Sequence, residues 1–276
     1  DVNSAYAEVV VPIVGSGNAV AGIDRLSLSL AGRYDRYSDF GSTCNPKFGL
    51  TWEPMSNLEI RASYGTSFRA PLLTEMIVND PRVQVVDAVD PLAPSGRTRG
   101  LSIRGNPDQL GPEEATTWSL GFQYSPTALP GLDVNLNYFS VDYDGQVFAV
   151  EGTEALLQEN IFADLIIRDP TAEQIQQVLN MGLRVQGADP TNVDFIVDTR
   201  AYNRGRTEQS GLDMQLAYDW NVEGIGEFRA TLIGMYLDKY DYQTTPLAPQ
   251  VDRLNTIINP LRFRGRALAC AARRHA

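Results

Sequence analysis

Apolar and polar residues alternate along several stretches of this chain. Between residues 25 and 37, leucines at 26, 28 and 30 alternate with serine, alanine and arginine side chains. Between residues 57 and 68, Ile60 and Tyr64 alternate with Arg61 and Ser63. A period of two predicts a β-strand with one apolar and one polar face. Together with further strand-like segments, the expected strands are 5–14, 25–37, 43–53, 57–68, 113–125, 132–138 (extending toward 150), 206–220 and 228–240.

The connections between these strands alternate in length. Antiparallel strands reverse direction at each connection, so every second connection lies at the same rim of a sheet. Long loops at one rim and short turns at the other are typical of outer-membrane barrels, whereas a soluble sandwich has no reason to keep this asymmetry. We expect residues 72–112, which show little sustained periodicity, and 151–204 to leave the sheet from one rim. The tight turns expected at the other rim are 54–57, 126–131 and 221–226.

The alternation also predicts which side chains share a face. The apolar residues are expected on the convex outer face of one curved sheet, and the polar residues on its concave side. The outer set is Leu26, Leu28, Leu30, Leu58, Ile60, Leu120, Phe122, Leu212, Met214 and Leu216. The concave set is Arg33, Arg61, Gln123, Asn135 and Gln215. The pattern alone does not separate a lipid-facing barrel from a sandwich that buries its leucines in a core.

The second long connection is expected to contain a short helix. Asp169 can cap this helix, Pro170 suits its first position, and Gly182 can end it. Ile175 and Val178 share one face by helical spacing. Packing of that face on the loop's own apolar residues is favoured over a role in binding a partner.

Composition narrows the choice of partners and of membrane topology. The formal charge is −11, with 23 basic and 34 acidic residues, so no basic face is expected for nucleic acid. The chain has no run of 18 apolar residues, which argues against a transmembrane helix but leaves barrel strands open. Aromatic residues near strand ends fit either interfacial girdles or a scattered core: Trp52, Trp118, Tyr124, Tyr138, Tyr218 and Trp220.

No motif in the chain supports an enzyme. Cys44 and Cys270 have no metal or redox spacing, and the single histidine, His275, lies near the end of the sequence. The glycines around Ser16 lack the lysine that a phosphate-binding loop requires. We therefore expect no catalytic residue, no metal site and no cofactor. The acidic residues of the first long connection are expected to be solvated: Asp80, Asp87 and Asp90.

Four motifs, in order, resemble the β-barrel of TonB-dependent outer-membrane receptors. The first runs from Tyr-Asp-Arg-Tyr-Ser-Asp-Phe-Gly at 34–41 into Asn-Pro-Lys-Phe-Gly-Leu-Thr-Trp-Glu-Pro at 45–54. The second is Phe-Arg-Ala-Pro at 68–71, which ends the stretch Arg-Ala-Ser-Tyr-Gly-Thr-Ser-Phe-Arg-Ala-Pro at 61–71. The third joins Asn106-Pro107 to Leu-Gly-Pro-Glu-Glu-Ala at 110–115, and the fourth runs from Asn-Arg-Gly at 203–205 to Ser-Gly-Leu-Asp at 210–213. The resemblance covers most of residues 5–265.

This resemblance implies an all-β fold, an antiparallel up-and-down transmembrane barrel segment of about eight to ten strands over residues 1–266. The long connections would be extracellular loops. It also implies a place in the bacterial outer membrane, in contact with its lipid. The expected activity is uptake of a scarce ligand (a ferric siderophore, cobalamin or a glycan) powered by the TonB energy-transducing complex. At the long-loop rim, Arg69 and Arg97 are candidate anion contacts, although ordinary solvated loop charge is favoured for either one alone.

The sequence also departs from the family pattern. We find neither the plug domain nor the TonB-contacting segment that precede the barrel in family members, and plugged transporters have about 22 strands. We therefore expect a fragment lacking plug and terminal strands, inactive as an isolated piece. Residues 267–276, ALACAARRHA, show no alternation and are expected to be an aberrant tail from a shifted frame or truncated gene.

Two other readings remain open at this point. One is a soluble or secreted all-β protein that binds carbohydrate, in which the leucines would pack against a second sheet. The other is a passive porin, which the Phe-Arg-Ala-Pro type of motif disfavours.

Overall fold

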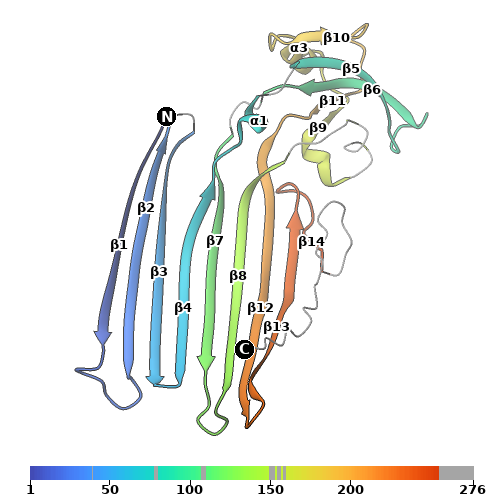
Figure 1. Ribbon diagram of the computed structural model, residues 1–276. Coiled ribbons are helices and arrows are strands. Elements are labelled where there is room, and N and C mark those ends of the chain that lie inside the picture. Colours follow the sequence, from blue (N-terminus) through green and yellow to red (C-terminus); the bar gives the residue numbers. More distant parts are fainter. Residues whose placement is uncertain are drawn as a thin grey trace.

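The computed structural model describes residues 1–38, 40–77, 80–106, 110–148, 153, 157 and 160–254. Within them, one large antiparallel sheet of nine strands stands beside a smaller sheet of five (Figure 1). No helix of the described residues is long and apolar enough to cross a membrane. The strands of the large sheet, in spatial order, are β1 (Val2–Val14), β2 (Arg25–Tyr37), β3 (Gly41–Met55), β4 (Leu58–Arg69), β7 (Glu113–Tyr124), β8 (Leu132–Phe148), β12 (Tyr202–Val222), β13 (Gly226–Gln243) and β14 (Val251–Asp252).

The large sheet confirms the expected all-β, up-and-down arrangement. Each of the eight predicted strands is present, and each pairs antiparallel with the next one, including across the two long connections, where β4 pairs with β7 and β8 pairs with β12. The two-residue β14, which was not expected, adds to the edge formed by β13. Because the sheet is open, β1 lies at its other edge.

The register of the sheet places the ten predicted apolar residues on one face. Ile60 lies between Trp52 and Phe122, and the same row continues across the later strands. Leu120 is 53% exposed and Leu232 is 60% exposed, so no second sheet among the described residues covers this apolar face. Polar side chains such as Gln123, which pairs with Asn135, occupy the opposite, polar face. This arrangement argues against the soluble sandwich.

Aromatic side chains form two rows on the apolar face. Along β7, Trp118 and Tyr124 are six residues apart, which corresponds to about 20 Å at ~3.3 Å per residue. That spacing is close to the ~25 Å apolar band of outer-membrane barrels, which aromatic girdles border on both sides. Trp118 is 43% exposed and Tyr124 is 36% exposed, which argues against a scattered core and fits the girdle interpretation. The row near the long connections contains Phe48, Tyr64, Trp118, Tyr138 and Tyr236, and the row near the short turns contains Trp52, Tyr124, Tyr218, Trp220 and Phe228.

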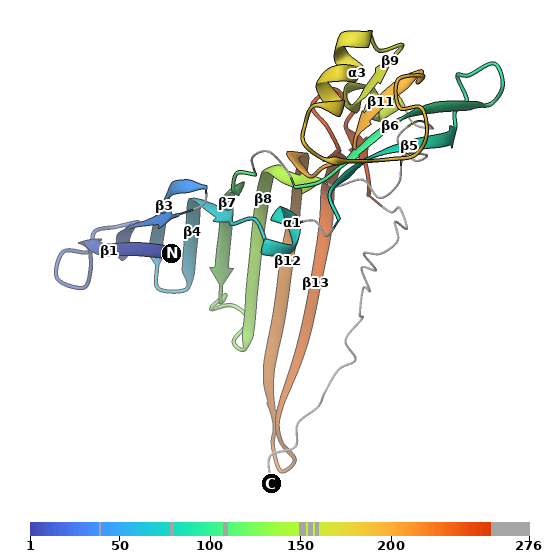
Figure 2. The same ribbon diagram turned by 90° about the horizontal axis from the view of Figure 1, so that it is seen from above.

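The two long connections leave the sheet from the same rim, as the counting argument predicted, and they fold together (Figure 1). We call this unit, residues 80–106 and 160–200, the cap. Its sheet order is β10-β5-β6-β11-β9, and β11 runs parallel to β6. Seen from above, the cap stands on the β8–β13 side of the large sheet, away from β1 (Figure 2). The cap elements are β5 (Arg82–Val89), β6 (Arg97–Arg104), η1 (Asn160–Leu165), β9 (Ile166–Arg168), α3 (Ala172–Leu179), β10 (Arg184–Gln186) and β11 (Phe195–Asp198); a short helix, α1 (Leu73–Met76), precedes them.

The cap sheet is covered by apolar side chains on both of its faces. Consecutive residues of β11 point to opposite sides, with Phe195 and Val197 in one cluster and Ile196 in the other. Phe195 is fully buried, and its ring lies against Gly100, where a Cβ would come within 2.4 Å of the ring. The first cluster adds Ala88, Leu157, Phe162 and Leu165; the second adds Val83, Leu101, Ile103, Ile175 and Val178.

The predicted helix is present as α3, but its capping residue was predicted wrongly. Thr171, not Asp169, is the N-cap: its side chain accepts from the Gln174 backbone N–H at 3.3 Å, and the Gln174 side chain accepts from the Thr171 backbone N–H at 2.8 Å. This reciprocal pair satisfies two donors of the first turn, which Asp169 could not reach from outside the helix. Pro170 therefore precedes the helix, and the C-cap is Asn180 rather than Gly182.

The expected packing of the helix is confirmed. Ile175 and Val178 are buried against Val83 and Leu101, so the helix closes one side of the cap sheet. Its apolar face is therefore occupied within the chain by residues of both long connections.

The expectation that Asp90 is solvated was wrong. Asp90 is 1% exposed and accepts hydrogen bonds from Arg168 Nη1 at 2.6 Å and from the Leu92 backbone N–H at 3.0 Å. The Arg168 hydrogen bond lowers the pKa of Asp90, burial opposes this effect, and the Leu92 N–H adds to the lowering. The ion pair joins the β5–β6 turn to β9, so it connects the two halves of the cap.

The cap should consequently lose stability in acid. Because the pKa of Asp90 is lower in the folded state, its contribution is complete above the unfolded value of about 3.9 and is lost as the pH falls below that value. We expect Asp90→Asn to weaken the cap by about 1–3 kcal/mol at pH 7, and the difference from wild type to shrink toward pH 3. Hydrogen exchange of peptides from residues 82–104, corrected for intrinsic rates, would measure this. Asp87→Asn, at an exposed carboxylate in the adjoining strand β5, is the matched control and should change little.

Candidate functional site

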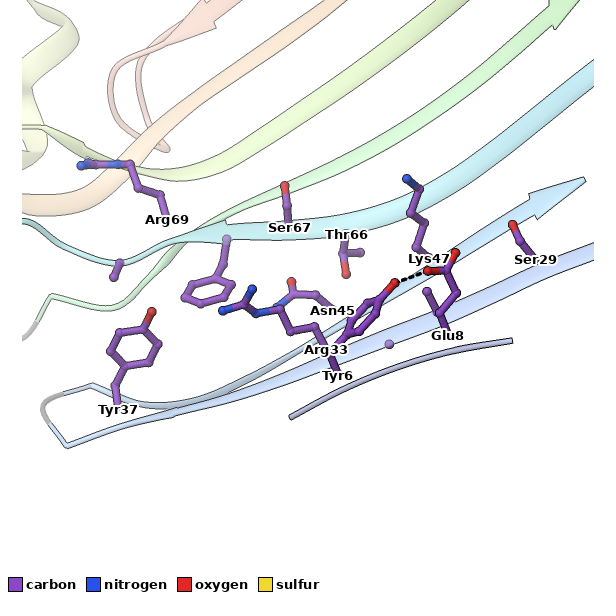
Figure 3. A pocket seen from close by; sticks show the side chains of 14 residues that line it. Tyr6, Glu8, Ser29, Arg33, Tyr37, Asn45, Lys47, Thr66, Ser67 and Arg69 are labelled. Atoms are coloured by element: carbon purple, nitrogen blue, oxygen red, sulfur yellow. Dashed lines mark hydrogen bonds between the residues drawn. The ribbon is translucent and has the colours of Figure 1, made fainter. Parts of the chain in front are cut away.

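The polar face contains a hollow of about 800 Å³ near the long-connection rim (Figure 3). Pairing between β3 and β4 ends at Lys47 and Gly65. Beyond that point β3 pairs only with β2, and β4 pairs only with β7, so the two strands diverge. The hollow opens at this divergence and is lined by side chains of the first four strands, including Tyr6, Glu8, Arg33, Tyr37, Asn45, Lys47, Phe68 and Arg69.

Arg33 is held in the hollow by a buried carboxylate. Its Nε donates to Asp35 Oδ2 at 2.8 Å and its Nη2 donates to Asp35 Oδ1 at 2.9 Å. Asp35 is fully buried and also accepts a hydrogen bond from the Ser4 hydroxyl at 2.5 Å. Since these contacts use one edge of the guanidinium, Arg33 Nη1 keeps no partner among the described residues and can donate into the hollow.

Arg69, a predicted site residue, is held in a similar way. Its Nε donates to Glu113 Oε2 at 2.7 Å, and its Nη2 donates to Glu75 Oε1 at 3.0 Å and to Glu113. Glu113 is 3% exposed and also accepts from the Val147 backbone N–H at 2.7 Å and from the Tyr143 hydroxyl. The guanidinium is thus fixed at the edge of the hollow.

Lys47 is the third cation of the hollow. Its ammonium group has no hydrogen-bond or ion-pair partner in the part of the chain that the structure describes, and the side chain extends from β3 to the same side of the strands as Ser67 (Figure 3). Ammonium and guanidinium groups donate charge-assisted hydrogen bonds to carboxylate and phosphate oxygens. The hollow can therefore bind an anionic group. Its lining also includes one acidic side chain, Glu8.

Sequence reasoning placed Arg33 on the polar face but did not identify Arg33 or Lys47 as site residues. The signal was the alternation itself, because both lie at polar-face positions of adjacent strands: Arg33 pairs with Asn45, two residues before Lys47. The alternation did not indicate that β3 and β4 diverge, and this divergence creates the hollow.

The structure does not bring the two predicted site residues together. Arg69 ends β4 in the large sheet, whereas Arg97 begins β6 in the cap. Arg97 is exposed, and its Nη2 donates to the Asp87 carbonyl oxygen at 2.8 Å. Among the described residues, no group of three or more His, Cys, Asp or Glu side chains is placed to hold a metal ion.

Comparison with known proteins points to one family. The family model described as TonB dependent receptor-like, beta-barrel matches residues 2–267. No curated protein gives a sequence match.

Solved structures share the fold at low sequence identity. A variant of the ferric enterobactin receptor PfeA from Pseudomonas aeruginosa, in complex with enterobactin, is 17% identical with a TM-score of 0.52, over 87% of this chain and 29% of that one. The siderophore receptor PirA from Acinetobacter baumannii is 16% identical with a TM-score of 0.51, over 89% of this chain and 31% of that one. The chain thus spans about a third of the length of the solved receptors it matches.

Proposed function

Because this chain belongs to the TonB-dependent receptor family, whose members are outer-membrane receptors and transporters rather than enzymes, we propose that it forms part of the barrel wall of an uptake receptor. The receptor would lie in the bacterial outer membrane, with the apolar face toward lipid and the polar face toward the lumen. The two aromatic rows and the exposed apolar belt between them support this placement. The TonB energy-transducing complex would supply the energy for transport.

The proposal assigns residues 1–266 to the barrel and treats 267–276 as a separate tail. Residues 255–276 lie outside the described part of the chain, so support for the barrel assignment comes from the strands up to β14 and from the family match over 2–267. We propose that this segment transports only as part of a complete barrel.

The ligand is proposed to be anionic, and the hollow between β3 and β4 is the observation that carries this choice. Arg33, Lys47 and Arg69 all line this one hollow on the polar face. Buried carboxylates behind two of them fix the guanidinium groups, so little side-chain entropy is lost on binding. A ferric siderophore with carboxylate or catecholate groups fits this arrangement better than a neutral glycan. Arg97, exposed on the cap, is proposed as an additional anion contact outside the hollow.

Uptake measurements in cells that carry the complete receptor would test this proposal. The probes are iron-55 complexes of a catecholate, a hydroxamate and a carboxylate siderophore, with cyanocobalamin and a maltodextrin as neutral alternatives. We expect Lys47→Ala and Arg33→Ala each to raise the half-saturating concentration of the transported siderophore about tenfold, which corresponds to ~1.4 kcal/mol. Arg229→Ala, at an exposed arginine near the short turns, is the control.

Loop deletion extends the same test. Removing residues 91–95 or 187–191, the exposed turns of the cap, should weaken uptake while the barrel stays folded. Unchanged uptake with both turns removed would contradict the proposed role of the cap. Uptake that persists without TonB would instead favour a passive porin, and transport of the maltodextrin alone would favour a glycan receptor.

A further inference from the structure

A buried carboxylate joins three strands of the large sheet at the rim from which both long connections leave. Arg69 is the last residue of β4 and Glu113 is the first residue of β7, so their ion pair closes the first long connection at its base. Glu113 also accepts hydrogen bonds from Tyr143 and from the Val147 backbone N–H, both in the part of β8 that leads into the second long connection. Because Glu113 is 3% exposed, protein groups rather than bulk water satisfy it.

Asn203 makes a second link across the same rim. It follows the second long connection as the second residue of β12. Its Nδ2 donates to the carbonyl oxygens of Gly145 at 2.7 Å and Gly111 at 3.0 Å, and its Oδ1 accepts from the Gly111 backbone N–H at 2.8 Å. One side chain therefore ties the end of the first connection to β8 and β12.

The bonds of Asn203, and that of Glu113 to the Val147 backbone N–H, lie beside an irregular part of the β8–β12 ladder, whereas Arg69 and Glu113 are partners in the regular β4–β7 ladder. Between β12 and β8, the register shifts between Asn203 and Gly205 and again between Gly205 and Thr207. Gly111 lies outside any strand. Bulged pairing fixes neighbouring strands less firmly than a regular ladder, because the extra residue is left unpaired. The side chains of Glu113 and Asn203 supply connections that the backbone does not make here.

We infer that Glu113 and Asn203 are positioning residues that set the orientation of the cap on the barrel. Together with Arg69, Tyr143 and Gly111 they form a clasp that holds the ends of β4, β7, β8 and β12. The clasp also gives three of the sequence motifs a structural role. Residues 68–71, 110–115 and 203–205 are far apart in the chain, but their side chains and backbone groups form contacts with one another at this rim. Through Arg69 the clasp reaches the hollow on the polar face.

A distance measurement between the cap and the barrel tests this role. Spin labels would be placed at Ser95, exposed in the β5–β6 turn, and at Ser42, exposed near the start of β3, after replacing Cys44 and Cys270 by serine. In the folded protein in detergent, pulsed electron resonance gives the distribution of the label separation. We expect Glu113→Gln and Asn203→Ala each to broaden that distribution at least twofold. Because this readout needs no ligand, its outcome is independent of the proposed function.

Matched controls separate positioning from general stability. Glu114→Gln changes the next residue, whose exposed side chain lies on the other face, and Asn221→Ala changes an exposed asparagine near the short-turn rim. Neither should broaden the distribution. If Glu113→Gln does not fold, Tyr143→Phe, which removes one donor only, takes its place beside Asn203→Ala. A label distribution that stays as narrow as wild type, with or without a lower unfolding midpoint, would overturn the inference.

Discussion

Replacing Phe195 by alanine should unfold the cap while leaving the barrel strands in place. Phe195 is fully buried in the cluster formed with Ala88, Phe162 and Leu165, and it pairs with Gly100 of the other long connection. Truncating a buried phenylalanine to alanine costs about 3–5 kcal/mol, from lost apolar burial and from the cavity left behind. The cap is small, so a loss of this size removes much of its stability.

Hydrogen exchange can resolve the cap from the barrel in one experiment. Peptides from 82–104 and 172–198 should exchange much faster in Phe195→Ala, whereas peptides from β7 and β8 should keep the wild-type rate. Ile167→Ala is the control, because Ile167 lies in the same sheet but is 41% exposed, and it should alter exchange little. Retained protection of the cap in Phe195→Ala would mean that the two connections do not share a core.

A charged residue on the apolar face should destabilise the membrane-inserted protein far more than the same residue on the polar face. Met214 and Gln215 are neighbours in β12: Met214 lies beside Leu136 in the apolar belt, and Gln215 lies beside Asn135 on the polar face. Arginine near the middle of the apolar belt costs about 2–4 kcal/mol, because the guanidinium must be removed from water. We therefore expect Met214→Arg to lower the unfolding free energy by that amount, and Gln215→Arg to have an effect of less than about 1 kcal/mol.

Urea unfolding in lipid vesicles, followed by tryptophan fluorescence, measures both variants. The tryptophans of the barrel lie in the aromatic rows and report on the lipid environment of the belt. Equal effects of the two arginines would show that the apolar face does not face lipid, and a larger effect of Gln215→Arg would reverse the assignment of the faces.

Strand positions and faces could be predicted from the sequence because one face of the large sheet carries apolar side chains and the other carries polar ones. Leu28 and Leu30 alternate with Ser27 and Ser29 for that reason. A shift of the strand register by one residue would have moved all four side chains to the wrong face. The alternating connection lengths then placed both long connections at one rim without any knowledge of the contacts between them.

The cap strands could not be predicted in this way, because apolar residues cover both faces of the cap sheet. In β11, Phe195, Ile196 and Val197 are all buried, so alternation disappears. In β5, Val85 and Val86 serve opposite clusters for the same reason. The first long connection therefore looked unstructured.

The ion pairs of the candidate site depend on register across distant segments. Arg69 meets Glu113 because β4 pairs with β7 in one particular alignment, and Arg168 meets Asp90 because the two long connections share a sheet. The sequence alone offered Arg69 as a candidate anion contact or a solvated loop charge, and Asp90 as a solvated loop residue, and it indicated neither ion pair. Contacts of this kind follow from the three-dimensional arrangement, not from local pattern.

The parallel pairing of β6 with β11 limits how such receptors can exchange their surface loops. Gly100 and Phe195 come from connections separated by two barrel strands, yet each completes the packing of the other. A graft that transfers only one of these connections into another barrel would bring half a core and expose its apolar residues. Recombination, antigenic variation or engineering at this rim should therefore succeed when both connections are transferred as a pair.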